Sequence, residues 1–554
     1  MMTATSPRKL ADDPKDRRLR QYALIRCAMT LAFLFALSFV LGDRLARDGR
    51  TGRTVSEWME TIGFLLIMTA VSYIAVRFIF AFFNRIWDGR VKSRILGKEY
   101  SDRQVFLFYS ACIFICWIPV FLAYYPSVFA YDAEGQLYQF LAHDYSTHHP
   151  LIHTLFLSAF FQIGGSLFAS YSAGMAIHSL VQMLLMALVF GYTLMVLYRG
   201  HTSWVMRLIL LVFYAIFPAN SILAISTTKD VLFSGLVLLY MVKLYQWISG
   251  GPKTKGLGAS FILLSAMMLL FRNNAVYAFL ASQPFIILLC GKKKRRQYLV
   301  AAMCSLLLFL AGSAGLKAVT SAKNGSPREM LSIPLQQMAR TRVLHEEEID
   351  AAMREELDGY LPKEWVFAAY NPYLADPVKN RAVIHDNPVG LIKTWVKLGL
   401  CFPLTYMDAF LSNSVGYWYL ADTTHAQIYG IGTESGFGYL STDNRTMPAG
   451  CEIVEHSYLP GLRAFMERIV SDNVYQKVPI VSVIFAPAFY WWLLCLYVAF
   501  FWYRREPGMI LPAVFLLLYY CTLLLSPTVL IRYMYPFVVS VPALICLISK
   551  RKST

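Results

Sequence analysis

Residues 124–136 read YYPSVFAYDAEGQ and follow a long apolar run. This stretch carries two carboxylates, Asp132 and Glu134, in a segment that has no Lys or Arg from Gln104 to Gln162. Charge so close to a membrane is costly, and such residues usually have a function. The side of the membrane on which these carboxylates lie therefore helps to define the topology of the chain, together with the other residues that reach that side.

The composition places the chain among membrane proteins. Its 554 residues are 57% hydrophobic and 15% charged, and the mean hydropathy is +0.48. These values are typical of a protein with many bilayer spans. The formal net charge of +17 could suggest nucleic acid, but the basic residues cluster in short pieces between apolar runs. Because that is the pattern of cytoplasmic loops, we expect membrane lipids and no nucleic acid as partners.

The apolar runs predict about twelve spans, with both ends of the chain in the cytoplasm. The basic block Lys292–Arg296 fixes the count, because it lies outside if Leu151–Phe168 is also a span. We therefore expect Leu151–Phe168 to be a short helix at the outer interface. The predicted spans are approximately 22–41, 62–83, 104–124, 171–197, 205–217, 231–248, 259–271, 276–290, 299–316, 480–501, 510–525 and 530–548.

The loop between the first two predicted spans contradicts the charge rule. It carries Arg44, Arg47, Arg50 and Arg53, yet the topology places it outside. Nearby acidic residues soften the conflict, and every later loop agrees with the scheme.

The expected fold class is an all-α polytopic membrane protein, with about twelve transmembrane helices and a mixed extracytoplasmic domain. Residues 1–103 hold the cytoplasmic N-terminus and two peripheral spans, and 104–319 form a core whose first external loop is 125–170. Residues 320–478 form the extracytoplasmic domain, and 479–554 hold three spans and a cytoplasmic tail. Cys401 and Cys451 fall in the external domain and could pair in an oxidising compartment.

Polar and charged residues gather on the predicted outer face, at the ends of separate spans. Each has an ordinary explanation: Asp132 could cap a helix that starts at Ala133, and arginines could reach lipid phosphates. His148 and His149 could form a turn, since metal binding would need a third ligand. These explanations leave the convergence of the residues unexplained. The set includes Asp132, Glu134, Gln136, His148, His149, Lys229, Arg272, Asn273, Arg340 and Arg532.

The motifs resemble those of the GT-C class of membrane glycosyltransferases, and more closely an uncharacterised bacterial family of that type. The resemblance covers about residues 104–548, and Ser127 replaces a usual glycine. Its motifs are Tyr125-Pro126-Ser127, Asp132 with Gln136, His149-Pro150, Lys229-Asp230, Arg272-Asn273-Asn274, Ile333-Pro334-Leu335-Gln336-Gln337 with Arg340, Ser526-Pro527, and Arg532-Tyr533-Met534-Tyr535-Pro536.

The resemblance implies an inverting glycosyltransferase. Its donor would be a polyprenyl-phosphate sugar, and its acceptor a cell-envelope glycan, lipid or protein. Asp132 would be the catalytic base, with Glu134 beside it, and four cations would bind the donor phosphate: Lys229, Arg272, Arg340 and Arg532. Gln136, His148, His149, Asn273 and Tyr533 would contact the substrates. A divalent cation, Mg²⁺ or Mn²⁺, remains an open alternative, and the expected location is the bacterial plasma membrane with the active site facing outside.

Two other classes of protein remain as alternatives. A transporter or flippase for a lipid-linked saccharide would carry its acidic residues at mid-depth in discontinuous helices, whereas Asp132 and Glu134 follow an apolar run. A polymer-binding scaffold would not require Arg and Lys at several span ends.

Overall fold

The computed structural model describes residues 14–87, 100–130, 132–249, 257–384, 388–422, 434–435, 438–440, 442, 444, 447–471 and 474–548. The predicted cytoplasmic ends of the chain, 1–13 and 549–554, lie outside these residues. The described chain is overwhelmingly helical. Two-residue strands, β1 (Glu434–Ser435) and β2 (Gly438–Tyr439), pair in antiparallel orientation. The protein is therefore an all-α polytopic membrane protein, as the apolar runs predict.

The helices of the first half follow the apolar runs. Serine caps begin two of them: Ser101 forms a capping box with Gln104, and Ser170 accepts a hydrogen bond from the Ala173 amide. In chain order they are α1 (Pro14–Asp48), α2 (Val55–Trp87), α3 (Asp102–Ala123), α4 (Ala133–Ala142), α5 (Leu151–Phe168), α6 (Tyr171–Arg199), α7 (Trp204–Ile216), α8 (Pro218–Ala224), α9 (Asp230–Ser249), α10 (Ala259–Phe271), α11 (Ala275–Leu289) and α12 (Lys292–Thr320).

The second half combines short helices with apolar ones. The short helices come first and are η2 (Pro327–Leu331), α13 (Ser332–His345), α14 (Ala351–Asp358), α15 (Lys363–Ala369), α16 (Asp376–Arg381), α17 (Pro388–Cys401) and α18 (Pro403–Trp418). The remainder are α20 (Pro460–Ser471), η3 (Val474–Lys477), α21 (Pro479–Phe485), α22 (Pro487–Tyr503), α23 (Pro507–Ile510), η4 (Leu511–Ala513), α24 (Val514–Leu523) and α25 (Ile531–Leu547).

Among the described residues, seven helices are long and apolar enough to cross a membrane, or up to nine if each of two bent pairs is one span. The bent pairs are α7 with α8, at 50°, and α21 with α22, at 76°. All twelve predicted spans fall on helices, but four of those helices or helix pairs are short: 259–271, 275–289, 507–523 and 535–547. The count of twelve spans therefore stays a prediction. The same holds for the interfacial position of α5, which is one of the seven.

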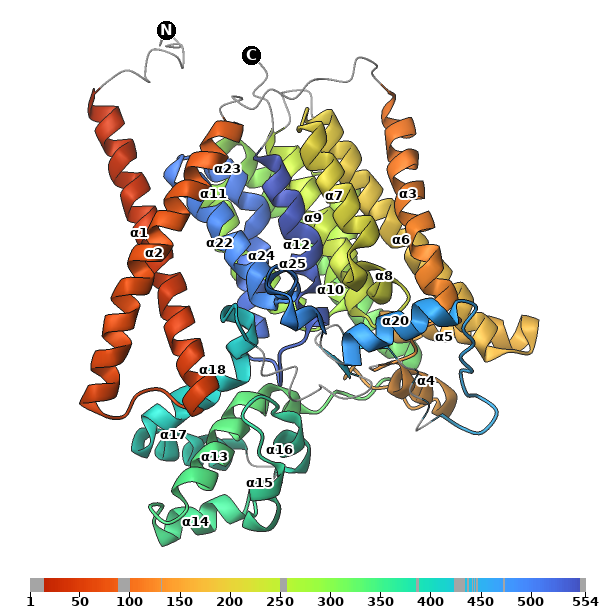
Figure 1. The fold of residues 1–554 in the computed structure, drawn as a ribbon. Coiled ribbons are helices and arrows are strands. Elements are labelled where there is room, and N and C mark those ends of the chain that lie inside the picture. Colours follow the sequence, from red (N-terminus) through yellow and green to blue (C-terminus); the bar gives the residue numbers. More distant parts are fainter. Residues whose placement is uncertain are drawn as a thin grey trace.

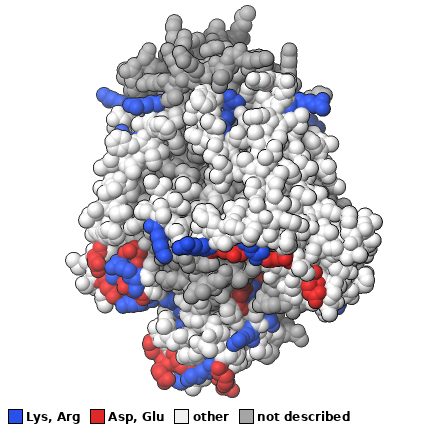
Figure 2. All heavy atoms as spheres, turned by 45° about the vertical axis from the view of Figure 1, so that its right-hand side comes forward, with Lys and Arg blue, Asp and Glu red and all other residues white. Residues whose placement is uncertain are grey.

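The surface supports a membrane location. Figure 2 shows charged side chains at two levels of the visible face, with a broad uncharged band between them. Only Lys and Arg appear at the upper level, whereas both signs of charge appear at the lower one. An uncharged band between polar ends is the surface that a bilayer requires.

Helices α13 to α17 form a lobe at the lower end of the helical bundle (Figure 1). The lobe has a hydrophobic core of its own, which includes Leu335, Met338, Leu357, Leu361 and Leu398, all almost completely buried. This lobe lies within the predicted extracytoplasmic domain, 320–478. Cys401 and Cys451, the two cysteines of that segment, are both free thiols.

The four arginines between the first two predicted spans, at the end of α1 and in the α1–α2 loop, are all paired with carboxylates. Arg53 forms an ion pair with the fully buried Asp408 of α18, and Thr51 donates two further hydrogen bonds to the same carboxylate, at 2.9 and 2.7 Å. The other pairs are Arg44 with Asp48 and Glu60, Arg47 with Asp43, and Arg50 with Glu57. Because their charge is neutralised, these arginines say little about the side of the membrane.

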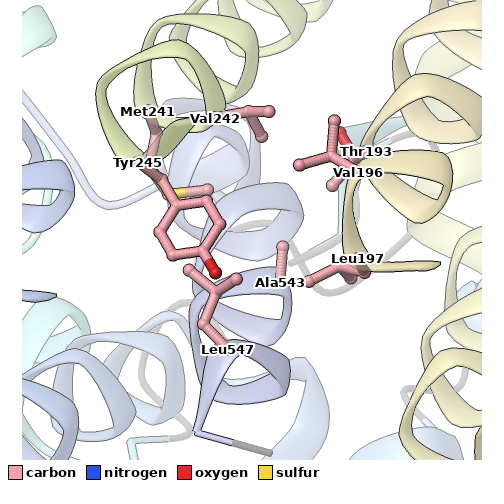
Figure 3. A pocket seen from close by; sticks show the side chains of 8 residues that line it. All are labelled: Thr193, Val196, Leu197, Met241, Val242, Tyr245, Ala543 and Leu547. Carbon is pink, nitrogen blue, oxygen red and sulfur yellow. The ribbon is translucent and has the colours of Figure 1, made fainter. Parts of the chain in front are cut away.

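A small apolar pocket lies between α6, α9 and α25 (Figure 3). Its lining includes Val196, Met241, Tyr245 and Leu547. Tyr245 lies four turns along α9 from the charged residues at the start of that helix, about 20 Å away at 1.5 Å per residue. The pocket therefore lies well away from the charged residues at the start of α9.

Candidate functional site

Two extended segments bring the first external loop next to the start of α9. The Val128 amide donates to the Ile225 carbonyl at 3.1 Å, and the Thr227 amide donates to the Val128 carbonyl at 3.1 Å. The Ala130 amide donates to the Thr227 hydroxyl at 3.2 Å. Gln182 of α6 supports this loop from behind with a 2.7 Å hydrogen bond to the Ser226 carbonyl. This backbone pairing places residue 132 beside residue 229.

Asp132 is paired with cations and does not cap α4. It occupies the N-cap position, but its side chain makes no capping hydrogen bond. Its carboxylate instead accepts a short hydrogen bond from the Lys229 ammonium and lies 3.4 Å from Nη1 of Arg532. The capping explanation of this residue is therefore wrong for the folded protein, because the capping oxygens point to cations from two other segments.

Asp230 is a second carboxylate of the site, and it does not belong to the predicted site residues. Its side chain is fully buried and forms ion pairs with Arg272 and, at 3.5 Å, with Nη1 of Arg532. The Thr228 hydroxyl donates to it at 3.1 Å. A weak signal for this role is present in the sequence, since Lys229-Asp230 heads an apolar run and is part of a motif.

Tyr533 lies between the two arginines. The guanidinium carbon of Arg272 is 4.9 Å from the centre of the Tyr533 ring, and that of Arg532 is 4.8 Å from it. Arg532 also donates to the Tyr533 hydroxyl at 3.4 Å. Cation–π contacts of this kind favour the planar guanidinium groups and hold them in place.

The loop before α5 carries the histidines. Asn273 donates to the backbone carbonyls of Thr147 and His148 at 3.1 and 3.2 Å, which ties this loop to the end of α10. His149 then lies with Nδ1 3.3 Å from the Lys229 ammonium. An ammonium only donates hydrogen bonds, so Nδ1 of His149 accepts and the ring proton is on Nε2. His148 packs edge-on against the His149 ring.

The charges around Asp132 shift the pKa values of the site. Burial alone would raise the pKa of Asp132, but Lys229 and Arg532 hold that pKa well below its usual range. Burial and the nearby Lys229 ammonium lower the pKa of His149 to about 3. Burial lowers the pKa of Lys229 as well, against the opposing effect of Asp132. At neutral pH the site therefore contains an ionised Asp132 and a neutral His149.

Two predicted site residues, Gln136 and Arg340, make their described side-chain contacts outside this ion-pair network. Gln136 is buried beneath it, where it donates to Thr154 at 3.0 Å and lies 3.1 Å from Nδ1 of His153. Glu134 is buried in the first turn of α4. Arg340 belongs to the lobe, where it donates to the Tyr370 hydroxyl at 3.0 Å and to the backbone carbonyl of Gly49. These contacts explain the presence of Arg340 by its structural role in the lobe. None of the described contacts links Arg340 to Asp132.

The site carries more positive than negative charge. Three cations, Lys229, Arg272 and Arg532, face two carboxylates, and their side chains are 14%, 10% and 8% exposed. The Asp132 side chain is the most accessible of the network at 28%. Helices α9 and α25 also begin here, and their N-termini add positive potential. We name these residues, with Asp230, His149 and Tyr533, the charged cluster.

The part of the chain that the structure describes holds no group of three or more His, Cys, Asp or Glu side chains that could bind a metal ion. Among the described residues, the two carboxylates of the charged cluster already have cationic side chains as partners.

The fold and the charged cluster define a polytopic helical membrane protein with a polar site at one end of its helices. Asp230 starts α9, Arg272 follows the end of α10, and Arg532 lies in the first turn of α25. Residues 143–554 match the family of unknown function DUF6020, and the chain belongs to that family. Lys229 lies within the matched region and Asp132 precedes it. Neither a curated protein nor a solved structure matches the chain.

Proposed function

We propose that the protein is an inverting glycosyltransferase that moves a sugar from a polyprenyl-phosphate donor to a cell-envelope acceptor. The observation that carries this proposal is the charged cluster: an accessible carboxylate beside three cations at one end of the membrane helices. Guanidinium groups match phosphate geometry, and Lys229 adds a point charge. The apolar helices around the cluster would accommodate the prenyl chain.

The transfer itself needs a base and a stabilised leaving group. The acceptor hydroxyl oxygen attacks the anomeric carbon, and Asp132 takes the hydroxyl proton. The bond between the anomeric carbon and the phosphate oxygen breaks, and its electron pair leaves with the polyprenyl phosphate, whose charge Arg532 and Lys229 stabilise. One base and one direct displacement invert the configuration at that carbon.

The proposed orientation places the charged cluster and the lobe outside a bacterial plasma membrane. The charge distribution supports it, because the block Lys292–Arg296 lies at the start of α12 and the lobe follows the end of the same helix. Labelling with a membrane-impermeant maleimide in intact cells tests it. A cysteine replacing the exposed Glu347 should react, and one replacing Lys292 should react only after the membrane is opened. The reverse pattern would exclude an external site.

A flippase for a lipid-linked saccharide is the second candidate. The bent pairs α7–α8 and α21–α22 favour it, because broken helices are common in transporters. The position of the charged cluster at helix ends favours the enzyme, since transporters bind substrates near mid-depth.

One experiment separates the two candidates. Cell-envelope glycans and polyprenyl-phosphate sugars are compared by mass spectrometry with and without the gene, and then with the gene restored as Asp132→Asn. A transferase predicts loss of one sugar decoration and accumulation of its lipid donor in both the deletion and the variant. Purified protein in nanodiscs should then transfer labelled sugar from extracted donor without any membrane potential or second compartment. Absence of transfer in this minimal system, together with transport of the lipid between leaflets by the same protein in closed vesicles, would favour the flippase.

A further inference from the structure

The two carboxylates of the charged cluster have different surroundings. Asp230 is completely buried and holds ion pairs to Arg272 and Arg532, with a hydrogen bond from Thr228. Asp132 keeps 28% of its side chain exposed. Its partners are the Lys229 ammonium and Nη1 of Arg532, the nitrogen that also pairs with Asp230. Removing a fully buried partner from a guanidinium is far more costly than exchanging one at an opening. Asp230 is therefore the permanent counter-ion, and Asp132 the exchangeable one.

The cations that hold Asp132 are those best placed for a ligand. Nη1 of Arg532 lies 3.4 Å from Asp132 and 3.5 Å from Asp230, so it is shared between the carboxylates. The described side-chain partners of Lys229 are Asp132 and His149, and Asp132 is the more exposed of the two at 28% against 11%. An ammonium and a guanidinium that both pair with one carboxylate form the arrangement that a phosphate oxygen would also need.

We infer that the carboxylate of Asp132 occupies the position of the ligand phosphate on Lys229 and Arg532, and that phosphate binding displaces it. This inference rests on the proposed function, and it names how the substrate activates that site. Paired with two cations, Asp132 is a poor proton acceptor. Once a phosphate takes the cations, the same carboxylate is free to accept a proton from an acceptor hydroxyl. The base is then exposed only when the donor is bound.

The described charged and titratable groups around Asp132 fit this exchange. Lys229, Arg532 and neutral His149 surround it, and Asp230 with Arg272 lies behind Arg532. With its proton on Nε2, His149 can donate one hydrogen bond and carries no charge that would hold Asp132 in place. Asp230 keeps Arg532 in position during the exchange, so that the guanidinium remains when Asp132 leaves.

If the Asp132 carboxylate competes with phosphate, the Asp132→Asn protein should bind phosphate more tightly than the wild type. The variant loses a competing carboxylate, and affinity should rise on the order of tenfold, which corresponds to about 1.4 kcal/mol. The full-length protein in nanodiscs is titrated with farnesyl phosphate and, separately, with inorganic phosphate, with fluorescence-based thermophoresis as the readout. A gain for both probes identifies the phosphate group as the ligand, and a gain for farnesyl phosphate alone identifies a lipid phosphate.

Two controls make the result specific. Asp144→Asn removes an exposed carboxylate of the same external loop, whose partner is Lys323 at 2.8 Å, and it should leave phosphate affinity unchanged. In a Lys229→Met background the gain from Asp132→Asn should shrink, because the carboxylate and the phosphate compete for that ammonium. An equal gain in that background, or no gain in the wild-type background, would overturn the exchange.

The same preparations separate this inference from the proposed function. Tighter binding together with lost sugar transfer supports both. Unchanged binding with lost transfer removes the exchange but leaves the transferase. Tighter binding with normal transfer keeps the exchange and removes Asp132 as the base.

Discussion

Lys229 donates a hydrogen bond to the carboxylate of Asp132 across 97 positions of sequence. This contact joins the first external loop to the start of α9, and Arg532 extends it to α25. Both of its members are polar residues at the ends of apolar segments, and each alone has an ordinary explanation. Together with Asp230 and Arg272 they form a site with excess positive charge, which no single segment carries.

The first prediction concerns Asp132 as the base. Asp132→Asn keeps the size of the side chain but accepts no proton at neutral pH, so sugar transfer should fall by about 10²-fold or more. Helix α4 should be unaffected, because the wild-type side chain makes no capping hydrogen bond. Transfer of labelled sugar by purified protein measures the effect, with expression level and Asp144→Asn as controls. Near-normal turnover would remove Asp132 from the mechanism.

The second prediction separates the two arginines. Arg532→Ala leaves each carboxylate with another partner, Lys229 for Asp132 and Arg272 for Asp230, so the stability of the fold should change little. The free energy of donor binding or of transition-state stabilisation should become less favourable by about 2–5 kcal/mol. Arg532→Lys should recover only part of the loss, since it lacks the planar fork. The measurement is the donor concentration dependence of transfer, paired with thermal unfolding. Unchanged donor dependence would mean that Arg532 serves only the fold.

The third prediction concerns Arg272, which should act on stability as well as on function. It forms an ion pair with the fully buried carboxylate of Asp230. Arg272→Ala leaves that charge undercompensated and should cost about 3–5 kcal/mol of stability. Thermal unfolding of Arg272→Ala beside Arg532→Ala tests this contrast. Equal melting temperatures for the two variants would contradict the assigned difference.

The fourth prediction follows from the neutral His149. Its pKa of about 3 in the folded protein is lower than the ordinary value of 6.5. Below pH 6.5 the unfolded chain therefore binds a proton that the folded protein does not, and stability falls as the pH drops from 6.5 toward 3, by about 1.4 kcal/mol per pH unit. His149→Gln should make the melting temperature less dependent on pH over this range. His143→Asn changes an exposed histidine instead, and should leave the wild-type pH dependence.

The fifth prediction concerns the contact between the α1–α2 loop and α18. Asp408 is fully buried, whereas the Arg53 side chain is 28% exposed. Arg53→Ala leaves a buried charge with only the Thr51 hydrogen bonds, whereas Asp408→Asn leaves a cation that water can reach. Arg53→Ala should therefore destabilise the protein more than Asp408→Asn, by about 1–3 kcal/mol. Thermal unfolding of both variants and of the double variant measures the coupling, and the opposite order would show that Thr51 alone satisfies Asp408.

The sequence by itself determined the class of protein and most of its helices. Apolar runs of sufficient length require helices in a bilayer, because the backbone must satisfy its own hydrogen bonds there. For the same reason, polar residues at the ends of those runs stand out, and Asp132, Lys229, Arg272 and Arg532 could be selected as site residues. The number of spans was harder to determine from the sequence. Short apolar helices such as α10 and α11 do not show by their length whether they cross the membrane.

Only the tertiary structure decided which of these residues meet. Arg532 reaches Asp132 and Asp230 across 400 and 302 positions of sequence, and no local pattern records a contact of that kind. The packing of the helices also brings Asp230 into the charged cluster and places Arg340 in the lobe. It pairs Asp132 with cations, whereas the sequence also allowed Asp132 to be a helix cap. The physical reason is that a charge in a low-dielectric interior must find a partner, and the packing of the helices determines which partner is within reach.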